Sequence, residues 1–416
     1  MSIKDNFPSV GPSLSLNFAR SKTLDPRITF SRASSSGDAT YIDGNGLIVT
    51  AAADEPRFDH KYENGVVKSL GLLVEEQRTN VLEQSVVTTS NWTGSTSNTT
   101  YSNLSLNALG IFPGVEVTST TGAAWHRIST AFNVPFVSGT GYAITFYYRE
   151  GTSGYARLQF RYNSQESYVQ GPADGSSWSI QQTIGSITNV TTTLMDGQST
   201  YKTSYIFTPN FTGDASMGVG IGTGSAGTTV IALGGQVEAG QFPTSYIPTS
   251  GSQKTRVNDI LSIEGSNFTD VYNQTEGSYK VEGFIDGTLP SNTYGGIFGA
   301  GGGGSGTSNF IYLNPGNNFG QYVSNTSQSP ASALSKTYTN GAKFKIAASY
   351  LEADYACSFN GDISNSSTSG ALNGSMTYFK IGGNPISTVI KGAMRISNIS
   401  YYPKQITDTQ LQNLTK

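Results

Sequence analysis

Sulfur-containing and ionisable side chains are scarce in this chain of 416 residues. A single cysteine, Cys357, excludes an intrachain disulfide and a metal site made of cysteines alone. The two histidines, His60 and His126, are too few for a zinc cluster. Charged residues make up 13% of the chain, against about 25% in an average soluble protein. We therefore expect no bound metal and no cofactor.

Clusters of lysine and arginine and long apolar runs are also missing. The 25 basic and 28 acidic residues give a net charge of −3. Nucleic-acid binding ordinarily needs a basic stripe that displaces counterions, so we expect no nucleic-acid partner. The opening residues 1–8 are not apolar, and from them we expect neither a signal peptide nor insertion into a membrane.

Glycine and aromatic residues are abundant instead. The chain has 49 Gly, 23 Tyr and 20 Phe, and Ser, Thr and Asn fill many of the other positions. Such a composition is untypical of coiled coils and of disordered tails, and it suits short strands joined by tight turns. The length allows two or three domains at roughly 100–200 residues each.

Short strand patterns recur along most of the chain and predict an all-β protein with two antiparallel β-sandwich (jelly-roll) domains in tandem. We divide the chain into an N-terminal attachment and hairpin segment that packs on the first sandwich, a first sandwich, a connector and a second sandwich. Their ranges are 1–85, 86–250, 251–275 and 276–416. Asp-Gly and Asn-Gly pairs predict hairpins at 40–48 and 358–363, and Thr407 is the expected N-cap of a C-terminal helix.

Candidate catalytic groups are few. Neither histidine has the sequence context of a nucleophile-activating triad, and a buried structural role is the commoner one. Glu352 and Asp354 match two of the three acids that laminarinase-like glycosidases carry on one strand, but Cys357 stands where the third acid belongs. Glycosidases need a pair of acids facing one cleft, so we assign no catalytic residue and expect no enzyme.

Aromatic side chains are the candidates for ligand binding, because an aromatic ring packs against the apolar face of a sugar ring. Most Tyr and Phe alternate within strands and belong to the core. The predicted ligand-binding residues are Trp125, Trp178, Tyr312 and Tyr322. The glycine-rich run 299–306 lacks the ending of a phosphate-binding loop and is expected to be a hairpin loop, with ligand recognition as the alternative.

Several long stretches of the sequence are distinctive enough to be compared with known families. They include GLLVEEQRTN at 71–80 and GQVEAGQFPTSYIPT at 235–249, together with residues 12–32, 41–47, 56–60, 255–259 and 392–411. These stretches resemble a family of bacteriophage virion appendage proteins, the tail fibres and head fibres of tailed phages, including those of cyanobacteria. The resemblance covers essentially the whole chain.

The resemblance implies a carbohydrate-binding-module-like jelly roll followed by a concanavalin A/laminin-G-like sandwich. It also implies a homotrimer located in the virion, assembled in the host cytoplasm, attached to other virion proteins by its N-terminal segment and binding host surface polysaccharide. A capsid or collar decoration protein without a ligand, and a polysaccharide depolymerase, are the alternatives. We read the shared residues as scaffold, in which arginines pair with nearby acids; the candidates are Arg20, Arg27, Arg32 and Arg57 with Asp25, Asp54, Asp59, Glu75 or Glu76.

Overall fold

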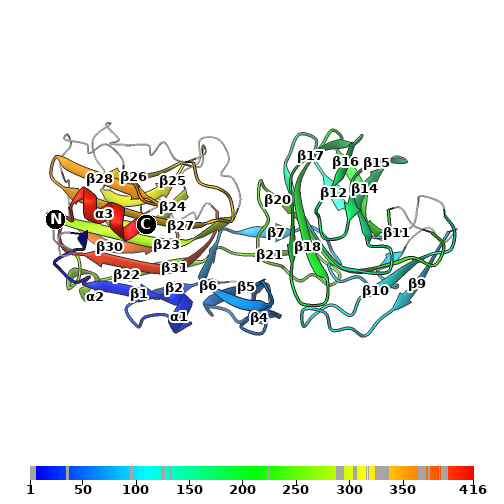
Figure 1. Ribbon diagram of the computed structural model, residues 1–416, viewed down its shortest axis with the longest axis horizontal. Coiled ribbons are helices and arrows are strands. Elements are labelled where there is room, and N and C mark those ends of the chain that lie inside the picture. The colour runs from blue at the N-terminus through cyan, green and yellow to red at the C-terminus, as the bar shows by residue number, and fades with distance from the viewer. Residues whose placement is uncertain are drawn as a thin grey trace.

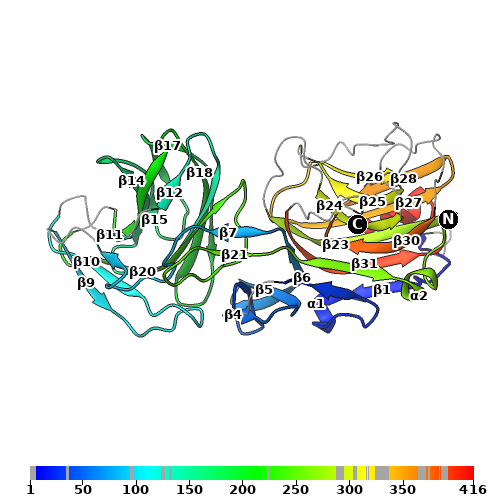
Figure 2. The same ribbon diagram turned by 180° about the vertical axis from the view of Figure 1, so that it is seen from behind.

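Two β-sandwiches lie end to end, joined by a narrow junction that β7 (Arg78–Asn80) and β21 (Lys254–Arg256) cross (Figure 1). Both ends of the chain lie on the second sandwich, with the C-terminus about midway along it (Figure 2). The architecture comes from a computed structural model, which describes residues 6–33, 37–93, 98–122, 127–130, 134–222, 225–286, 295–302, 307–314, 316, 318–323, 337–363, 372, 375–383, 385 and 392–416. The all-β class predicted from the sequence is confirmed.

The first sandwich consists of two antiparallel sheets. The junction sheet faces the second sandwich, and its strands in order are β17 (Gly185–Leu194), β18 (Thr200–Pro209), β13 (Tyr142–Glu150), β20 (Thr229–Ala239), β10 (Val115–Ser119) and β9 (Thr99–Asn103). The distal sheet lies behind it and contains β16 (Ser179–Gln182), β15 (Gln165–Pro172), β14 (Tyr155–Tyr162), β19 (Gly213–Gly220), β11 (Arg127–Thr130) and β8 (Trp92–Thr93), with β12 (Val134–Phe136) beside β19.

The second sandwich also has two antiparallel sheets. The β23 sheet contains β29 (Asp362–Ile363), β28 (Asp354–Phe359), β27 (Lys343–Leu351), β23 (Glu276–Asp286), β31 (Ala393–Tyr402), β6 (Val66–Glu75) and β5 (Arg57–Glu63), with β1 (Leu14–Asn17) also paired to β31. The β24 sheet contains β2 (Thr29–Ser31), β22 (Ile260–Glu264), β30 (Met376–Ile381), β24 (Gly295–Gly302), β25 (Ser308–Leu313) and β26 (Phe319–Val323).

Strand alternation decides which side chains fill each core. On β13, Ile144, Phe146 and Tyr148 point into the core of the first sandwich. Tyr147 points the other way and packs with Tyr246 in a smaller cluster at the junction. Successive side chains of a strand face opposite sides of a sheet, so a strand with apolar residues at nearly every position is covered on both faces. The junction sheet is such a sheet.

The N-terminal segment is placed differently from the predicted arrangement. Leu14 and Leu16 lie in the core of the second sandwich, not the first. β1 pairs with β31 and β6 pairs with β31 on the same sheet, while β2 pairs with β22 on the other. β7 and the hairpin of β3 (Ala39–Ile42) and β4 (Ile48–Ala51) contact the first sandwich, Ile48 through the junction cluster, and Leu82 lies in the core of that sandwich. Local patterns identify strands but carry no information on their distant partners.

The predicted connector at 251–275 contains two strands, β21 and β22, of which β22 belongs to the β24 sheet. A helical turn follows as α2 (Ser266–Thr269), close to its expected position. The first helix, α1 (Phe18–Ser21), continues directly from β1. The C-terminal helix α3 (Asp408–Thr415) begins as predicted, with Thr407 forming a capping box with Gln410.

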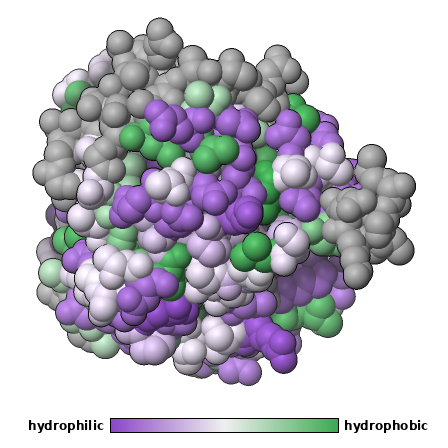
Figure 3. Space-filling model, turned by 90° about the vertical axis from the view of Figure 1, so that its left-hand side faces the viewer, coloured by the Kyte–Doolittle hydropathy of each residue, from purple (hydrophilic) through white to green (hydrophobic). Residues whose placement is uncertain are grey.

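The free end of the second sandwich carries a mixed surface. Figure 3 shows hydrophobic residues scattered among hydrophilic ones over its coloured part. Scattered apolar residues are normal on protein surfaces, whereas a broad apolar patch marks an interface.

A candidate ligand cleft at the junction of the two sandwiches

A buried network of ion pairs holds the two sandwiches together. Arg57 on β5 donates from Nη1 to Glu75 Oε2 at 2.7 Å and from Nη2 to Asp259 Oδ2 at 2.7 Å. Arg32 reaches the other oxygen of Asp259 at 3.1 Å, and Arg256 reaches Glu75 at 3.1 Å. All five side chains are fully buried. The predicted pairing of Arg57 with Glu75 is confirmed, and Arg32 takes Asp259 as its ion-pair partner.

The charges of this network are mutually compensated. Burial alone would raise the pKa of Glu75, but the guanidinium groups of Arg256 and Arg57 outweigh it and hold that pKa well below its usual range. Ser245 adds two hydrogen bonds to Glu75 by donating from its backbone N–H and its hydroxyl, each at 2.7 Å. A buried carboxylate is tolerated only with such partners.

The segment 243–249 is fixed along its length by side chains of the flanking strands. Gln236 donates to the carbonyl of Ser245 at 3.1 Å and accepts from the backbone N–H of Ile247 at 2.6 Å. Asn80 donates to the carbonyl of Ile247 at 2.9 Å. These hydrogen bonds therefore pin an irregular segment against the junction sheet.

A second ionic group lies beside this network. Arg395 on β31 pairs with Asp59 at 2.6 Å and with Asp286. Lys202 on β18 approaches them from the first sandwich, yet its ammonium group makes no hydrogen bond or ion pair with any residue that the structure describes. Burial lowers the pKa of Lys202, and the attraction of Asp286 offsets this only in part.

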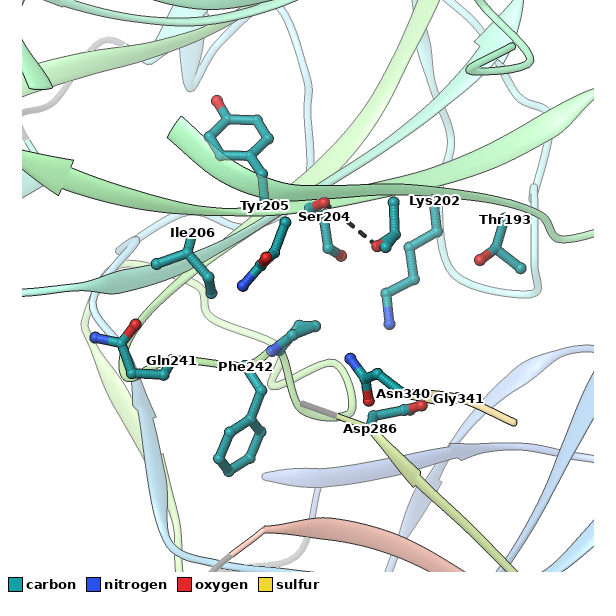
Figure 4. Close-up of a pocket in the computed structure, with 13 residues that line it drawn as sticks. Thr193, Lys202, Ser204, Tyr205, Ile206, Gln241, Phe242, Asp286, Asn340 and Gly341 are labelled. Atoms are coloured by element: carbon teal, nitrogen blue, oxygen red, sulfur yellow. Dashed lines mark hydrogen bonds between the residues drawn. The ribbon is translucent and has the colours of Figure 1, made fainter. Parts of the chain in front are cut away.

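Lys202 projects into a cavity of about 220 Å³ between the two sandwiches (Figure 4). Thr193 lies on the same side, on β17, while Asp286 and Asn340 approach from the second sandwich. Strand alternation on β17 and β18 turns alternate side chains toward this space. The complete lining is Asn189, Thr191, Thr193, Lys202, Ser204, Tyr205, Ile206, Gln241, Phe242, Pro243, Asp286, Asn340 and Gly341.

A second cavity of about 280 Å³ adjoins the first and shares Thr193, Lys202, Asp286 and Gly341 with it. His60 lines this second space and is 4% exposed. Its Nδ1 lies 2.9 Å from the carbonyl oxygen of Ile42, and its Nε2 has no hydrogen-bond partner among the described residues. The two spaces form one groove of mixed polar and apolar lining with Lys202 at its centre, which we call the junction cleft.

Neutral hydrogen-bonding groups are common in the first space of the junction cleft, whereas the second space has charged side chains and apolar ones such as Leu70 and Met195. Hydroxyls come from Thr191 and Thr193, and amides come from Asn189, Gln241 and Asn340. Ligand sites combine a concave shape with a few convergent polar groups. Amides and hydroxyls both donate and accept, so this lining suits a ligand that carries many hydroxyl groups.

The three described aromatic residues predicted to bind ligand, Trp178, Tyr312 and Tyr322, do not belong to the lining of the junction cleft. Trp125 lies outside the described residues. Trp178 is half-buried, packs on the core of the first sandwich and donates from Nε1 to the hydroxyl of Thr192 at 3.1 Å. Its role as a ligand contact stays a prediction.

Tyr312 and Tyr322 lie together on the outer face of the β24 sheet. Ile311 points into the core, so strand alternation turns Tyr312 outward. Phe310 is on the same face, with its ring centroid 5.2 Å from that of Tyr322. Tyr312 is 5% exposed, whereas Tyr322 is half-buried. Ligand binding by this pair also stays a prediction.

The acids considered for hydrolysis lie in a tight turn and not along one strand. Glu352 is in the turn between β27 and β28, and Asp354 is the first residue of β28. Ala353 between them has a φ of +57°. The alternation that would turn both acids toward one cleft is therefore broken. Cys357 lies in the core, and burial raises the pKa of its thiol to about 12.

Among the described residues, no group of three or more His, Cys, Asp or Glu side chains is placed to hold a metal ion. In the same part of the chain, no helix has the length and apolar character needed to cross a membrane. The predicted loop at 299–306 is strand over its first four residues, which belong to β24, and the rest lies outside the described residues.

Lys202 and Asp286, the central residues of the junction cleft, were not among the residues predicted from the sequence. One signal was present, since Lys202 is the only charged residue in β18. A single lysine inside an otherwise uncharged strand is compatible with solvent exposure as well as with a site. Asp286 gave no signal, because it ends a strand where an acidic residue is unremarkable.

Comparison with known proteins adds little beyond the fold. No protein-family model matches the chain, and no curated protein matches it. Similar solved structures include the Ruminococcus gnavus IT-sialidase CBM40 bound to α2,6 sialyllactose, with 15% identity and a TM-score of 0.30 over 36% of this chain and 88% of that one.

Two further structures are domain 4 of AbnA and a whole sialidase. The first is from a GH43 extracellular arabinanase of Geobacillus stearothermophilus in complex with arabinotriose, with 16% identity and a TM-score of 0.30 over 42% of this chain and 80% of that one. The second is Trypanosoma rangeli sialidase in complex with 2,3-difluorosialic acid, with 9% identity and a TM-score of 0.31 over 94% and 98%. At this level the likeness carries no argument about ligand or activity.

Proposed function

We propose that this protein binds a neutral, hydroxyl-rich saccharide of a cell surface in the junction cleft, without cleaving it. The observation that carries the proposal is the ammonium group of half-buried Lys202, which has no partner among the described residues and faces a space lined by amides and hydroxyls. A partly desolvated ammonium group without a protein partner is costly. A sugar hydroxyl that accepts a hydrogen bond from Lys202 removes this cost.

The local charge balance favours a neutral ligand. Lys202 and Arg395 supply two positive charges, and Asp59 and Asp286 supply two negative ones. A strongly acidic ligand would meet both carboxylates at short range, and a strongly basic ligand would meet both cations. Hydroxyl groups interact favourably with all four side chains.

The size of the junction cleft favours a short stretch of a saccharide chain. Its two spaces, of about 220 and 280 Å³, each lie below the usual range of about 300–1,000 Å³ for small-molecule pockets. Binding at one such cleft is expected to be weak. Several copies on one particle would multiply the affinity, provided that the copies reach neighbouring saccharides at the same time.

We further propose that the protein is a homotrimeric virion appendage that carries this cleft to the host surface. This part of the proposal rests on the sequence resemblance alone. Immunogold electron microscopy of virions tests the location, and the mass of the purified protein in solution tests the trimer. Label on the capsid or collar together with no saccharide binding would support the decoration alternative instead.

A glycan array tests the proposed binding, with the wild type and two variants of β17. Thr193 is exposed and lines both spaces of the cleft, so Thr193→Trp fills them. Thr188 is exposed on the same strand but does not line the cleft, so Thr188→Trp is the matched control. We expect the wild type and Thr188→Trp to bind the same neutral glycans and Thr193→Trp to lose them.

Two results contradict the proposal. The first is an absence of wild-type binding on an array that includes the host's surface saccharides. The second is equal binding by Thr193→Trp and Thr188→Trp. Release of reducing ends from a bound saccharide would show cleavage and would support the depolymerase alternative.

A further inference from the structure

A cluster of charged side chains lies on the outer face of the distal sheet, and its charges are unbalanced. Glu166 on β15 pairs with Arg157 at 2.6 Å and with Arg127 at 3.0 Å, and Nε of Arg161 lies 4.0 Å from it. One carboxylate thus serves three guanidinium groups. These four residues, called the arginine cluster, carry two positive charges in excess.

The Arg127 side chain crosses the outer face of β19 to join the arginine cluster. β19 runs between β11 and β14, and Gly218 faces outward on it. A Cβ atom at Gly218 would lie 3.5 Å from Cδ of Arg127, so the Arg127 side chain passes directly over this glycine. It thereby reaches Glu166, which lies three strands away across the sheet.

Arg157 is held in one orientation before any ligand arrives. Its Nε donates to Gln159 at 2.9 Å and its Nη1 to Gln170 at 3.3 Å. The guanidinium group also stacks on the ring of Tyr168, with Cζ 3.6 Å from the ring centroid. A planar guanidinium fixed in this way is a pre-organised donor for oxyanions.

The crowding of positive charge has an energetic cost within the cluster. The side chains of Arg127 and Arg157 are 9% and 7% exposed. Burial lowers the pKa of Arg127, and repulsion by Arg161 and Arg157 lowers it further. Arg161 is 42% exposed and open to solvent. The acidic residue of β19 is Asp214, which is exposed and lies at the edge of the arginine cluster.

We propose that the arginine cluster binds the oxyanion group of an acidic saccharide, a carboxylate or a sulfate ester, with Arg161 as the first contact. A nucleic acid is disfavoured, because the Tyr168 ring is already covered by Arg157 and is closed to base stacking. A polyphosphate backbone also needs many cationic contacts, which a chain of net charge −3 does not offer. This site lies on the opposite side of the sandwich from the junction cleft and is independent of it.

Calorimetry in low-salt buffer tests the proposal with four polymers. Polygalacturonate supplies carboxylates and dextran sulfate supplies sulfate esters, while neutral dextran and single-stranded DNA are the comparisons. We expect at least one acidic polysaccharide to bind and the other two polymers to bind far more weakly. Arg161→Gln should weaken that binding about three- to tenfold, because it removes one charge-assisted hydrogen bond at a half-exposed position.

Arg20→Gln is the matched control, since Arg20 is an exposed arginine on α1 of the second sandwich and the charge change is identical. Arg20→Gln and the cleft-filling Thr193→Trp should both leave the acidic polysaccharide bound as in the wild type. The proposal is overturned if neither acidic polysaccharide binds, if neutral dextran or DNA binds as tightly to the cleft-filled Thr193→Trp, or if Arg161→Gln and Arg20→Gln weaken binding equally. The melting temperature of Arg161→Gln confirms that the variant is folded.

Discussion

Arg57 and Asp259 are 202 positions apart in the chain, and their side chains form a fully buried ion pair of 2.7 Å. Arg57 belongs to the N-terminal segment, and Asp259 follows the strand that leaves the first sandwich. The pair therefore joins the part of the chain that precedes the first sandwich to the part that follows it. The relative position of the two sandwiches, and with it the junction cleft, depends on this contact.

Arg57→Ala should lower the free energy of unfolding by about 3–5 kcal/mol, because it leaves buried carboxylates without their partner. Denaturant titration measures this loss. Arg27→Ala is the control, since Arg27 pairs with Asp25 near the surface and such pairs contribute less than about 1 kcal/mol. Equal and small effects of the two variants would contradict the structural role of the network.

Acid should weaken the protein through Glu75. Its pKa in the folded state lies below the usual 4.5, so its stabilising contribution is complete above that value and is lost as the pH falls below it. Melting temperatures measured from pH 7 to pH 3 should drop most steeply below 4.5. Glu75→Gln should melt lower at pH 7 with a flatter profile, whereas the exposed Glu264→Gln should follow the wild type. A wild-type profile that is flat over this range would exclude the role of Glu75.

Lys202→Met should raise the melting temperature at pH 7 and abolish saccharide binding. Burial lowers the pKa of Lys202, so the ammonium form destabilises the fold at neutral pH, and the advantage of the methionine variant should shrink as the pH rises toward 10.5. Such a trade between stability and function is common at binding sites. Lys404→Met, at an exposed position, should change neither property. Unaltered binding by Lys202→Met would remove Lys202 from the site.

Gly71→Ala should destabilise the second sandwich by at least about 2 kcal/mol, since a strained backbone is combined with a steric clash. Gly71 on β6 has a φ of +104°, and a Cβ atom there would lie 2.2 Å from the carbonyl oxygen of Ile396. Gly11→Ala, with no atom within 4 Å of its Cβ, should be neutral. Denaturant titration compares the two. A neutral Gly71→Ala would argue against the close pairing of β6 and β31.

Residues 251–416 alone should fail to fold, because they lack β1, β2, β5 and β6. Circular dichroism and near-ultraviolet spectra of this fragment test the expectation, and co-expression with residues 1–80 should restore the native signal. A fragment that folds alone with wild-type stability would show that the N-terminal strands are dispensable additions.

Local structure could be predicted from the sequence to a large extent. The hairpin at 40–48 and the cap at Thr407 follow from turn residues and capping preferences that act over a few positions. The destination of the N-terminal strands could not be predicted in this way. Leu14 and Leu16 have the same alternating pattern whichever sheet receives them.

The candidate site was harder to predict for a related reason. Arg57 could be predicted to pair with a nearby acid, and Glu75 was among the five candidates that the sequence left open. The junction cleft, in contrast, exists only where β18 meets the turn around Asn340, and these elements are distant in the chain. Aromatic residues were the signal sought for sugar binding, whereas the central residues of the cleft are a lysine and an aspartate, with amides and hydroxyls around them in its first space.

The most direct test of the binding proposal is a crystal structure of the protein with the neutral saccharide that ranks first on the glycan array. Our account predicts ligand density in the junction cleft, with a sugar hydroxyl within hydrogen-bond distance of Lys202 Nζ and the chain passing over Thr193. Density on the outer face of the β24 sheet near Tyr322, or elsewhere with the cleft empty, would contradict it.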